Sequence, residues 1–321
     1  MGTYIIRRVL QMIPVLLGAT FLIFAMVFAL PGDPTDGKCG ERPCSAAYIA
    51  EFKKEYNLND NLLLRYAKYT GIWPQERDGA TKFDGLLQGN LGKNYNGYKV
   101  AEDLQQRYPV TAKLALVAIV FEVVIGIAAG VLTGVRKGGF LDNLVLVSTL
   151  VVISIPIFVI GALGQYFLGV KLGWFPVTVG SNPTFYQLLL PGMVLGALSI
   201  AYVSRLTRTN LVENLRADYV RTAIAKGLTR RRAVGLHALR NSLIPVVTFI
   251  GFDFGGLLGG AIVTERIFNI QGVGSYIYRG ILNRDGMAVV GAVTVLVLVY
   301  LIVNLIVDLL YGVLDPRISH D

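Results

Sequence analysis

The sequence predicts an all-α polytopic membrane protein with six transmembrane helices. Of its 321 residues, 54% are apolar and only 16% are charged, and the mean hydropathy is +0.56. Such a composition is typical of a membrane protein rather than of a soluble chain of this length. The apolar runs are unbroken and lack the period-two alternation of membrane-spanning strands, which argues against a closed β-barrel.

Six stretches of roughly 20 residues are each long and apolar enough for a helix to cross about 30 Å of hydrocarbon. The fourth is the weakest, because Pro191, Gly192 and Ser199 dilute it, and Pro156 is expected to kink the third. The predicted spans are 9–30, 114–135, 144–170, 188–204, 243–264 and 287–311.

Basic residues in the short segments that flank the spans predict the orientation of the chain in the membrane. Arg7 and Arg8 precede the first span, and Arg136 and Lys137 lie between the second and third. Both flanks are therefore expected in the cytoplasm, as are the two chain termini. This topology divides the chain into an N-terminal helix (1–30), a long extracytoplasmic segment (31–110) and a core domain of five helices (111–321).

Two cysteines, Cys39 and Cys44, flank a short turn in the extracytoplasmic segment. Because the outside of the membrane is oxidising, a local disulfide is as plausible as two free thiols. With only these cysteines and two histidines in the chain, we expect no metal site.

A basic block at residues 205–245 separates the fourth and fifth spans. It carries nine Lys or Arg residues against two acids, so it is expected to stay in the cytoplasm as a loop over 205–243. Its length exceeds that of a simple helix connection, which indicates a docking element. The sequence at 218–227, DYVRTAIAKG, predicts a short helix.

We expect Asp218 to cap this helix through its carboxylate and Gly227 to end it in a left-handed conformation. Helical spacing places Tyr219, Ala223 and Lys226 near one face, with Val220 and Ile224 on another. So short a helix needs a partner surface. Small residues favour a protein groove, whereas the surrounding arginines favour anionic lipid headgroups.

Polar residues inside the spans are candidates for a translocation path. Glu122 shares a helical face with a glycine stripe at 126, 130 and 134, which favours a packing face with one partnered acid over a proton relay. Asp253 lies beside a second stripe at 251, 255 and 259, and Asp308 is better explained by structural pairing. The path candidates are Glu122, Asp253, Tyr300 and Asn304.

The sequence contains no pattern for covalent chemistry. It lacks a phosphate-binding loop, and its histidines, His237 and His320, form no catalytic arrangement. We therefore expect a chain that is not an enzyme, binds no cofactor and has no nucleic acid partner. Energy for transport would come from an ion gradient or from a separate ATPase.

The basic block resembles the coupling loop of B-type permease subunits in the dipeptide/oligopeptide/nickel family of binding-protein-dependent ABC importers. The resembling segment reads ADYVRTAIAKGLTRRRAVGLHALRNSLIPVVT. The resemblance extends over nearly the whole chain, through RRVLQMIPVLLGATFLIF, LPGDP, QGNLGKNYNGYKVAEDLQQRYPVTAKLAL, IVTERIFNIQGVGSYIYRGI and VDLLYGVLDPRI. It implies the type I importer permease fold and a place in the bacterial inner membrane.

The resemblance also implies a role for the short helix at 217–227, which in this family sits in a cleft of a cytoplasmic ATPase. The chain departs from the general importer motif, since Arg221 replaces a Glu and Arg240 replaces a Pro. The coupling residues carried over are Ala217, Asp218, Tyr219, Arg221, Thr222, Ala223, Lys226 and Gly227.

The implied partners are a homologous second permease, one or two ATPases that use ATP and Mg, an extracytoplasmic peptide-binding protein and membrane lipid. The expected cargo is a di- or oligopeptide. Two alternatives stay open: the same ABC architecture carrying nickel or another small chelate, and an ion-coupled secondary transporter. The second alternative would need Glu122, Asp253 or Asp308 as a relay and would leave the basic block unexplained.

Overall fold

The computed structural model describes residues 2–29, 35, 44–77, 80–258 and 261–314. Two compact units make up the chain: one comprises residues 109–274 and 299–321, and the other comprises residues 2–108 and 275–298. These units are defined by packing, whereas the predicted parts 1–30, 31–110 and 111–321 are defined by the side of the membrane. The predicted division therefore stays a prediction.

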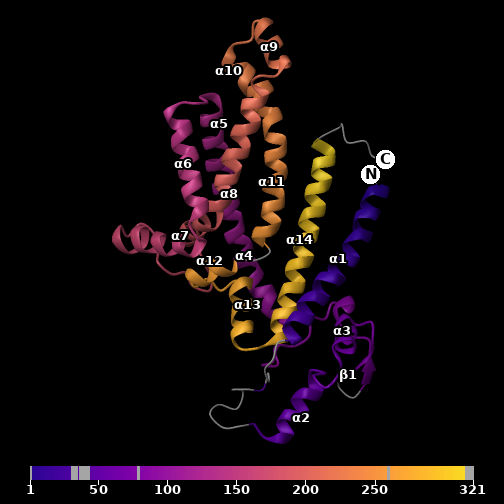
Figure 1. Ribbon diagram of the computed structural model, residues 1–321. Coiled ribbons are helices and arrows are strands. Elements are labelled where there is room, and N and C mark those ends of the chain that lie inside the picture. The colour runs from indigo at the N-terminus through magenta and orange to yellow at the C-terminus, as the bar shows by residue number, and fades with distance from the viewer. Residues whose placement is uncertain (1, 30–34, 36–43, 78–79, 259–260, 315–321) are drawn as a thin grey trace. The chain divides into compact units, whose positions relative to one another are not determined.

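The unit around residues 109–274 is helical throughout its described elements (Figure 1). Its elements are η2 (Glu122–Gly126), α5 (Ile127–Val135), α6 (Phe140–Ser154), α7 (Ile157–Gly164), η3 (Gln165–Lys171), α8 (Phe185–Asn214), α9 (Asp218–Ala225), α10 (Arg230–Ala233), η4 (Val234–Leu239), α11 (Arg240–Leu258) and α12 (Ile262–Ile267). Three helices contribute residues to both units: α4 (Val100–Phe121), α13 (Val273–Leu282) and α14 (Gly286–Leu314).

The described residues contain six candidate membrane spans if a sharply bent pair of helices counts as one. Five helices are long and apolar enough to cross a membrane alone, and a sixth candidate is the pair formed by α6 with α7 and η3. The predicted number of spans is thereby confirmed on that count. The five single spans are Ile5–Ala29, Val100–Val135, Phe185–Asn214, Arg230–Leu258 and Gly286–Leu309.

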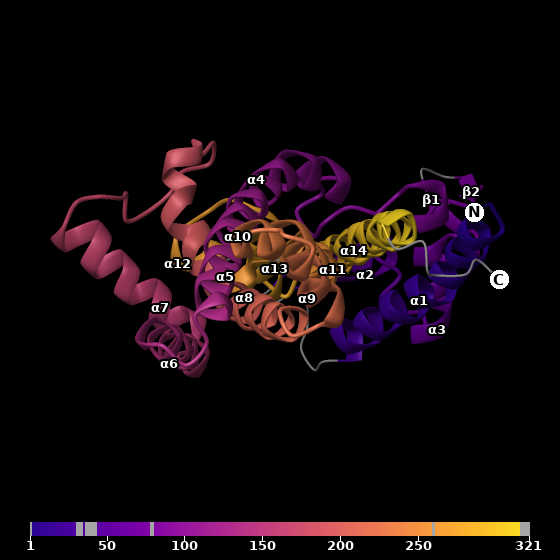
Figure 2. The ribbon, with the colours of Figure 1, turned by 90° about the horizontal axis from the view of Figure 1, so that it is seen from above.

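The third predicted span is not one straight helix. The chain bends by 105° between Ser154 and Ile157, and α7 leads away from the axis of α6 in the view from above (Figure 2). Ile155 adopts an extended conformation, with φ −97° and ψ 127°, as expected for a residue that precedes a proline. The kink expected at Pro156 is confirmed, but the helix breaks there completely.

Several predicted boundaries differ from the observed helix ends. The helix of the fourth span, α8, runs to Asn214 rather than to residue 204, so residues 205–214 of the predicted loop 205–243 are helical. The helix of the second span begins at Val100 rather than at residue 114, because its first turns are polar and hydropathy detects only its apolar part. The fifth span, predicted over 243–264, belongs to a helix that ends at Leu258, and Thr264 lies on the separate helix α12. The third glycine of its predicted stripe, Gly259, lies outside the described residues.

Close packing of α5 on α8 uses the glycine stripe. A Cβ added to Gly126 would lie 2.8 Å from a methyl of Val203, and one added to Gly130 would lie 2.5 Å from the Cβ of Thr207. Glycine permits this approach, which is a common basis of helix association in membranes. The predicted packing of the glycines is confirmed, and α5 and α8 run side by side over the length of α5 (Figure 1). The acid on this face, Glu122, was expected to be partnered, but its carboxylate oxygens have no hydrogen-bond partner among the described residues.

The other unit surrounds a cluster of aromatic side chains. Phe24 of α1 is fully buried with Tyr69 and Val290, and the hydroxyl groups of Tyr69 and Thr294 share a hydrogen bond of 2.9 Å. Burial raises the pKa of Tyr69 to about 12. The elements wholly in this unit are α1 (Gly2–Ala29), α2 (Ala46–Glu55), α3 (Leu62–Thr70), η1 (Leu86–Gln88) and the antiparallel pair β1 (Gln75–Arg77) and β2 (Ala80–Lys82), which the sequence did not predict.

Gly130→Ala is expected to destabilise the protein by about 1–3 kcal/mol, because the new methyl group would overlap the side chain of Thr207. The measurement is the thermal midpoint of the purified protein in detergent. Gly18→Ala, in α1, is the matched control, since nothing lies within 4 Å of its added Cβ. Equal midpoints for the two variants would contradict the packing assignment.

Candidate coupling surface and membrane path

The short helix α9 is attached to the end of α8 through an apolar cluster. Leu211, in the last turn of α8, is fully buried against Val220 of α9, Ala233 of α10 and Ala238 of η4. Figure 1 shows α9 and α10 beyond the neighbouring ends of α8 and α11. Because Leu211 is also the residue that Gly134 of α5 faces, the cluster joins α9 to the packed pair of α5 and α8.

Polar contacts reinforce this attachment. The hydroxyl of Tyr219 donates a hydrogen bond to the side-chain oxygen of Asn214, the final residue of α8. The amide nitrogen of the same side chain donates to the hydroxyl of Ser242 on α11 at 3.1 Å. One asparagine therefore contacts both α9 and α11, so that α9 has a defined position on its own chain.

The helix ends as predicted at Gly227, whose φ is +92°. The backbone N–H of Gly227 donates to the carbonyl of Ile224 at 2.9 Å, and that of Leu228 donates to the carbonyl of Ala223 at 3.2 Å. These two bonds form a Schellman motif, in which glycine is favoured because the residue must be left-handed. The expected turn is confirmed.

Two finer predictions for α9 are wrong. The residue that caps the helix is Ala217, which has no side-chain hydrogen bond, and Asp218 is the first helical residue with an exposed carboxylate. The inner face consists of Val220 and Ala223, with exposed fractions of 2% and 9%, whereas Tyr219 was predicted to share a face with Ala223. Burial of Val220 is decided by the contact with Leu211 in the last turn of α8, which helical spacing within α9 does not reveal.

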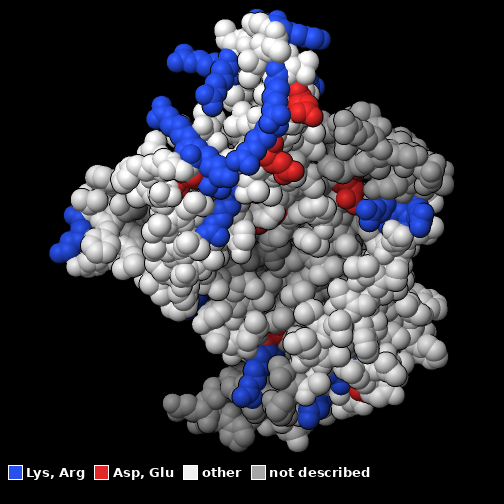
Figure 3. Space-filling model, turned by 45° about the horizontal axis from the view of Figure 1, so that its top comes forward, with Lys and Arg blue, Asp and Glu red and all other residues white. Residues whose placement is uncertain are grey.

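The outer face of α9 is exposed and both apolar and basic. Tyr219 and Ile224 are 41% and 45% exposed. Arg221 lies 3.7 Å from Asp218, but both side chains are largely in solvent, so this ion pair adds little stability. Figure 3 shows Lys and Arg side chains gathered over this end of the protein; the exposed basic residues here are Arg216, Arg221, Lys226, Arg230, Arg231, Arg232 and Arg240.

The predicted path residues come together in the unit around residues 109–274. Glu122 is fully buried, neither of its carboxylate oxygens accepts a hydrogen bond from a described residue, and its carboxyl group lies close enough to that of Asp253 to interact. Asn304 and Tyr300 of α14 lie against Gly255 of α11. Each has an atom 3.3 Å from the position that a Cβ added to Gly255 would occupy. The four candidates thus belong to three neighbouring segments, η2, α11 and α14.

Glu122 also begins the π-helical turn η2, an irregularity that is frequent at functional sites in helices. The sequence gives no signal for such a turn. The role of these residues as path lining stays a prediction, as does the disulfide, because Cys39 lies outside the described residues.

Sequence reasoning missed an ion pair between α6 and α8. Arg208 donates two hydrogen bonds to the carboxylate of Asp142, and Asp142 is almost completely buried. A signal was present in the sequence: an acid occurs near the start of an apolar stretch, and Arg205 and Arg208 occur one turn apart at the end of another.

The helical fold, the membrane spans and the attached basic helix define an integral membrane component of a transport system. Residues 123–320 match the family described as "Binding-protein-dependent transport system inner membrane component". Residues 1–115 match the family that describes the N-terminal part of this membrane component. The chain belongs to this family. It is a multi-pass permease with the type I importer fold, as the resemblance implied.

Curated relatives align over their full lengths. The chain is 33% identical to the dipeptide transport system permease protein DppB of Alkalihalophilus pseudofirmus, covering 100% of both chains. It is 35% identical to the di/tripeptide transport system permease protein DppB of Pseudomonas aeruginosa, covering 100% of this chain and 99% of the relative. It is also 35% identical to the oligopeptide transport system permease protein AppB of Bacillus subtilis, covering 100% of both.

Val220→Ala is expected to loosen α9 on its own chain, since it removes two buried methyl groups worth about 1.5 kcal/mol from the cluster with Leu211. Faster amide hydrogen exchange over residues 218–225 would report this change. Ile224→Ala is the matched variant on the exposed face, for which a change within about 0.5 kcal/mol is expected. Slower or unchanged exchange in Val220→Ala would contradict the inner-face assignment.

Proposed function

We propose that this chain is the permease subunit of an ATP-driven ABC importer that takes up di- or oligopeptides. The proposal rests on full-length similarity to permeases named for dipeptides, di/tripeptides and oligopeptides. The single structural observation that carries it is α9, a helix whose inner face is buried on its own chain and whose outer face is free to bind a partner.

The outer face of α9 suits a cytoplasmic ATPase. Tyr219 and Ile224 supply apolar contacts, and Arg221, Thr222 and Lys226 supply exposed polar groups around them. An eight-residue helix is too short to be stable by itself, so its burial against α8 prepares it for docking. The ATPase binds ATP and Mg, while this chain itself performs no hydrolysis and holds no cofactor.

The path for the cargo is formed with a homologous second permease. Glu122, Asp253, Tyr300 and Asn304 line it on this chain, and modest polar groups of this kind suit peptides that share a backbone but differ in side chains. An extracytoplasmic peptide-binding protein delivers the cargo and supplies most of the selectivity. The protein lies in the inner membrane of a bacterium, and the lipids of that membrane contact its spans. The segment 31–110 lies outside the membrane, and both termini lie in the cytoplasm.

Reconstitution tests this function. The chain, a second permease of the same transport system, its ATPases and its binding protein are placed in proteoliposomes, and uptake of a radiolabelled dipeptide is measured with and without ATP. We expect uptake only with ATP and with the binding protein. Uptake that follows an imposed proton gradient without ATP would overturn the proposal in favour of an ion-coupled transporter, and selective uptake of nickel would overturn the peptide cargo.

Gly227→Val is expected to abolish ATP-dependent uptake while the complex remains in the membrane. A β-branched residue at φ +92° costs about 1–3 kcal/mol and displaces the end of α9, although the added Cβ itself meets no atom within 4 Å. Gly235→Val is the control, because its Cβ is equally unhindered and its φ is not positive. Normal uptake by the Gly227 variant would contradict a coupling role for α9.

A further inference from the structure

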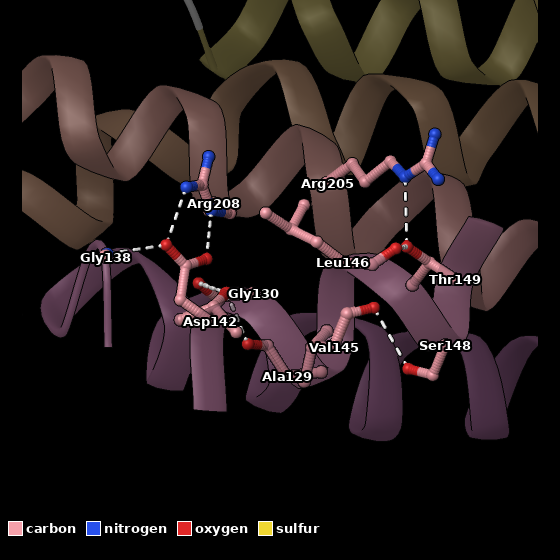
Figure 4. Close-up of polar contacts among 11 residues, drawn as sticks. Ala129, Gly130, Gly138, Asp142, Val145, Leu146, Ser148, Thr149, Arg205 and Arg208 are labelled. Atoms are coloured by element: carbon pink, nitrogen blue, oxygen red, sulfur yellow. Dashed lines mark hydrogen bonds and ion pairs between the residues drawn. The ribbon is translucent and has the colours of Figure 1, made fainter. Parts of the chain in front are cut away.

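The ion pair between α6 and α8 has the geometry of a joint between two helices. Asp142 Oδ1 accepts a hydrogen bond from Arg208 Nε at 2.5 Å, and Oδ2 accepts one from Nη2 at 2.7 Å (Figure 4). Such a bidentate pair fixes both distance and orientation. The exposed fractions of the two side chains are 2% for Asp142 and 19% for Arg208, so water screens the pair weakly.

The same carboxylate also closes the turn between α5 and α6. Its Oδ2 accepts a hydrogen bond of 2.8 Å from the backbone N–H of Gly138, a residue with φ +82°. Asp142 therefore accepts three hydrogen bonds, from α8 and from the turn that precedes its own helix. Replacing Asp142 would therefore weaken both its contact with Arg208 on α8 and its contact with Gly138 in the turn.

A second contact lies two turns further along α6. Arg205 Nε donates to the hydroxyl of Thr149 at 3.1 Å, and Thr149 is 7% exposed (Figure 4). Arg205 and Arg208 are three residues apart, so they lie on one face of α8. This face is held by α6, while the face with Val203 and Thr207 is held by the glycines of η2 and α5.

Leu211, which anchors α9, lies one turn beyond Arg208 on α8, on the ridge with Val203 and Thr207 that faces the glycine stripe. The distance from the anchor to Arg208 is one helical turn, about 5 Å of rise. α8 is one unbroken helix over Phe185–Asn214, so a displacement of α9 moves Arg208 as part of the same rigid element. Through Asp142 that displacement reaches α6.

We propose that Asp142 is a positioning residue for energy coupling, because its carboxylate makes α6 move with α8 and hence with α9. The inference rests on the proposed function. Without the pair, α9 would still be attached to α8 and α5, but α6 and the bent helix α7 behind it would lose their charged link to the moving helix. Transport would then become partly uncoupled from ATP hydrolysis.

The test uses the complete reconstituted transporter and measures ATP hydrolysis and peptide uptake in the same preparation. Asp142→Asn removes the charge and one of the acceptor oxygens that Arg208 uses. We expect ATP hydrolysis to continue while the number of peptides taken up per ATP falls about tenfold, within the usual range of coupling between sites. Ser148→Ala is the control on α6, since its exposed hydroxyl donates only to the carbonyl of Val145 and lies away from α8.

Arg208→Lys keeps the charge but not the two-pronged geometry, and we expect a smaller loss of the same kind. If Asp142→Asn does not assemble, the lysine variant carries the test. In the double variant Asp142→Asn/Arg208→Gln, uptake per ATP should fall no further than in Asp142→Asn, since both changes remove one interaction.

Unchanged uptake per ATP in the variants would overturn the inference, and so would a parallel fall of hydrolysis and uptake, which would indicate structural support only. These outcomes differ from failure of the proposed function, in which the unmodified transporter itself shows no ATP-dependent peptide uptake.

Discussion

The close approach of α5 to α8 is the contact on which the end of this permease that carries α9 depends. Lipid tails are as apolar as leucine, so the hydrophobic effect does not drive helices together within a bilayer, and close packing must do so. The glycines of α5 allow that packing, since any side chain at Gly130 would overlap Thr207. α8 thereby becomes a fixed support, and its last turn presents Leu211 to the segment that follows.

α9 depends on this support because it has two faces with different tasks. Val220 is buried against α8, α10 and η4, and Ala223 beside it is also buried. This burial stabilises a helix that has too few residues to persist in water. Ile224, one residue after Ala223, is left nearly half exposed. A helix held by its own chain on one side loses little conformational entropy when a partner binds the other side. This is the physical argument for treating α9 as a rigid contact rather than as a flexible loop.

Sequence reasoning predicted the features that depend on local pattern. Apolar runs located the spans, Pro156 located the bend, and Gly227 located the end of α9. It failed where burial depends on distant residues. The inner face of α9 is selected by contact with Leu211 of α8 and with α10 and η4, and the spacing of apolar residues within α9 does not separate Val220 from Ile224. The partner of Asp142 lies 66 positions along the chain, so the pair could be suspected from two separate polar signals but not assigned.

Two of the buried acids of the helical unit, Asp142 and Glu122, illustrate different ways in which a membrane protein places a carboxylate. Asp142 accepts three hydrogen bonds from Arg208 and Gly138, so its charge is compensated within the chain. Glu122 accepts none from a described residue, and the group that lies close enough to interact with it is another acid, Asp253. A carboxyl group at membrane depth needs a donor, a proton or water. The compensated acid therefore suits the proposed joint between α6 and α8, whereas the uncompensated acid suits the proposed lining of the path.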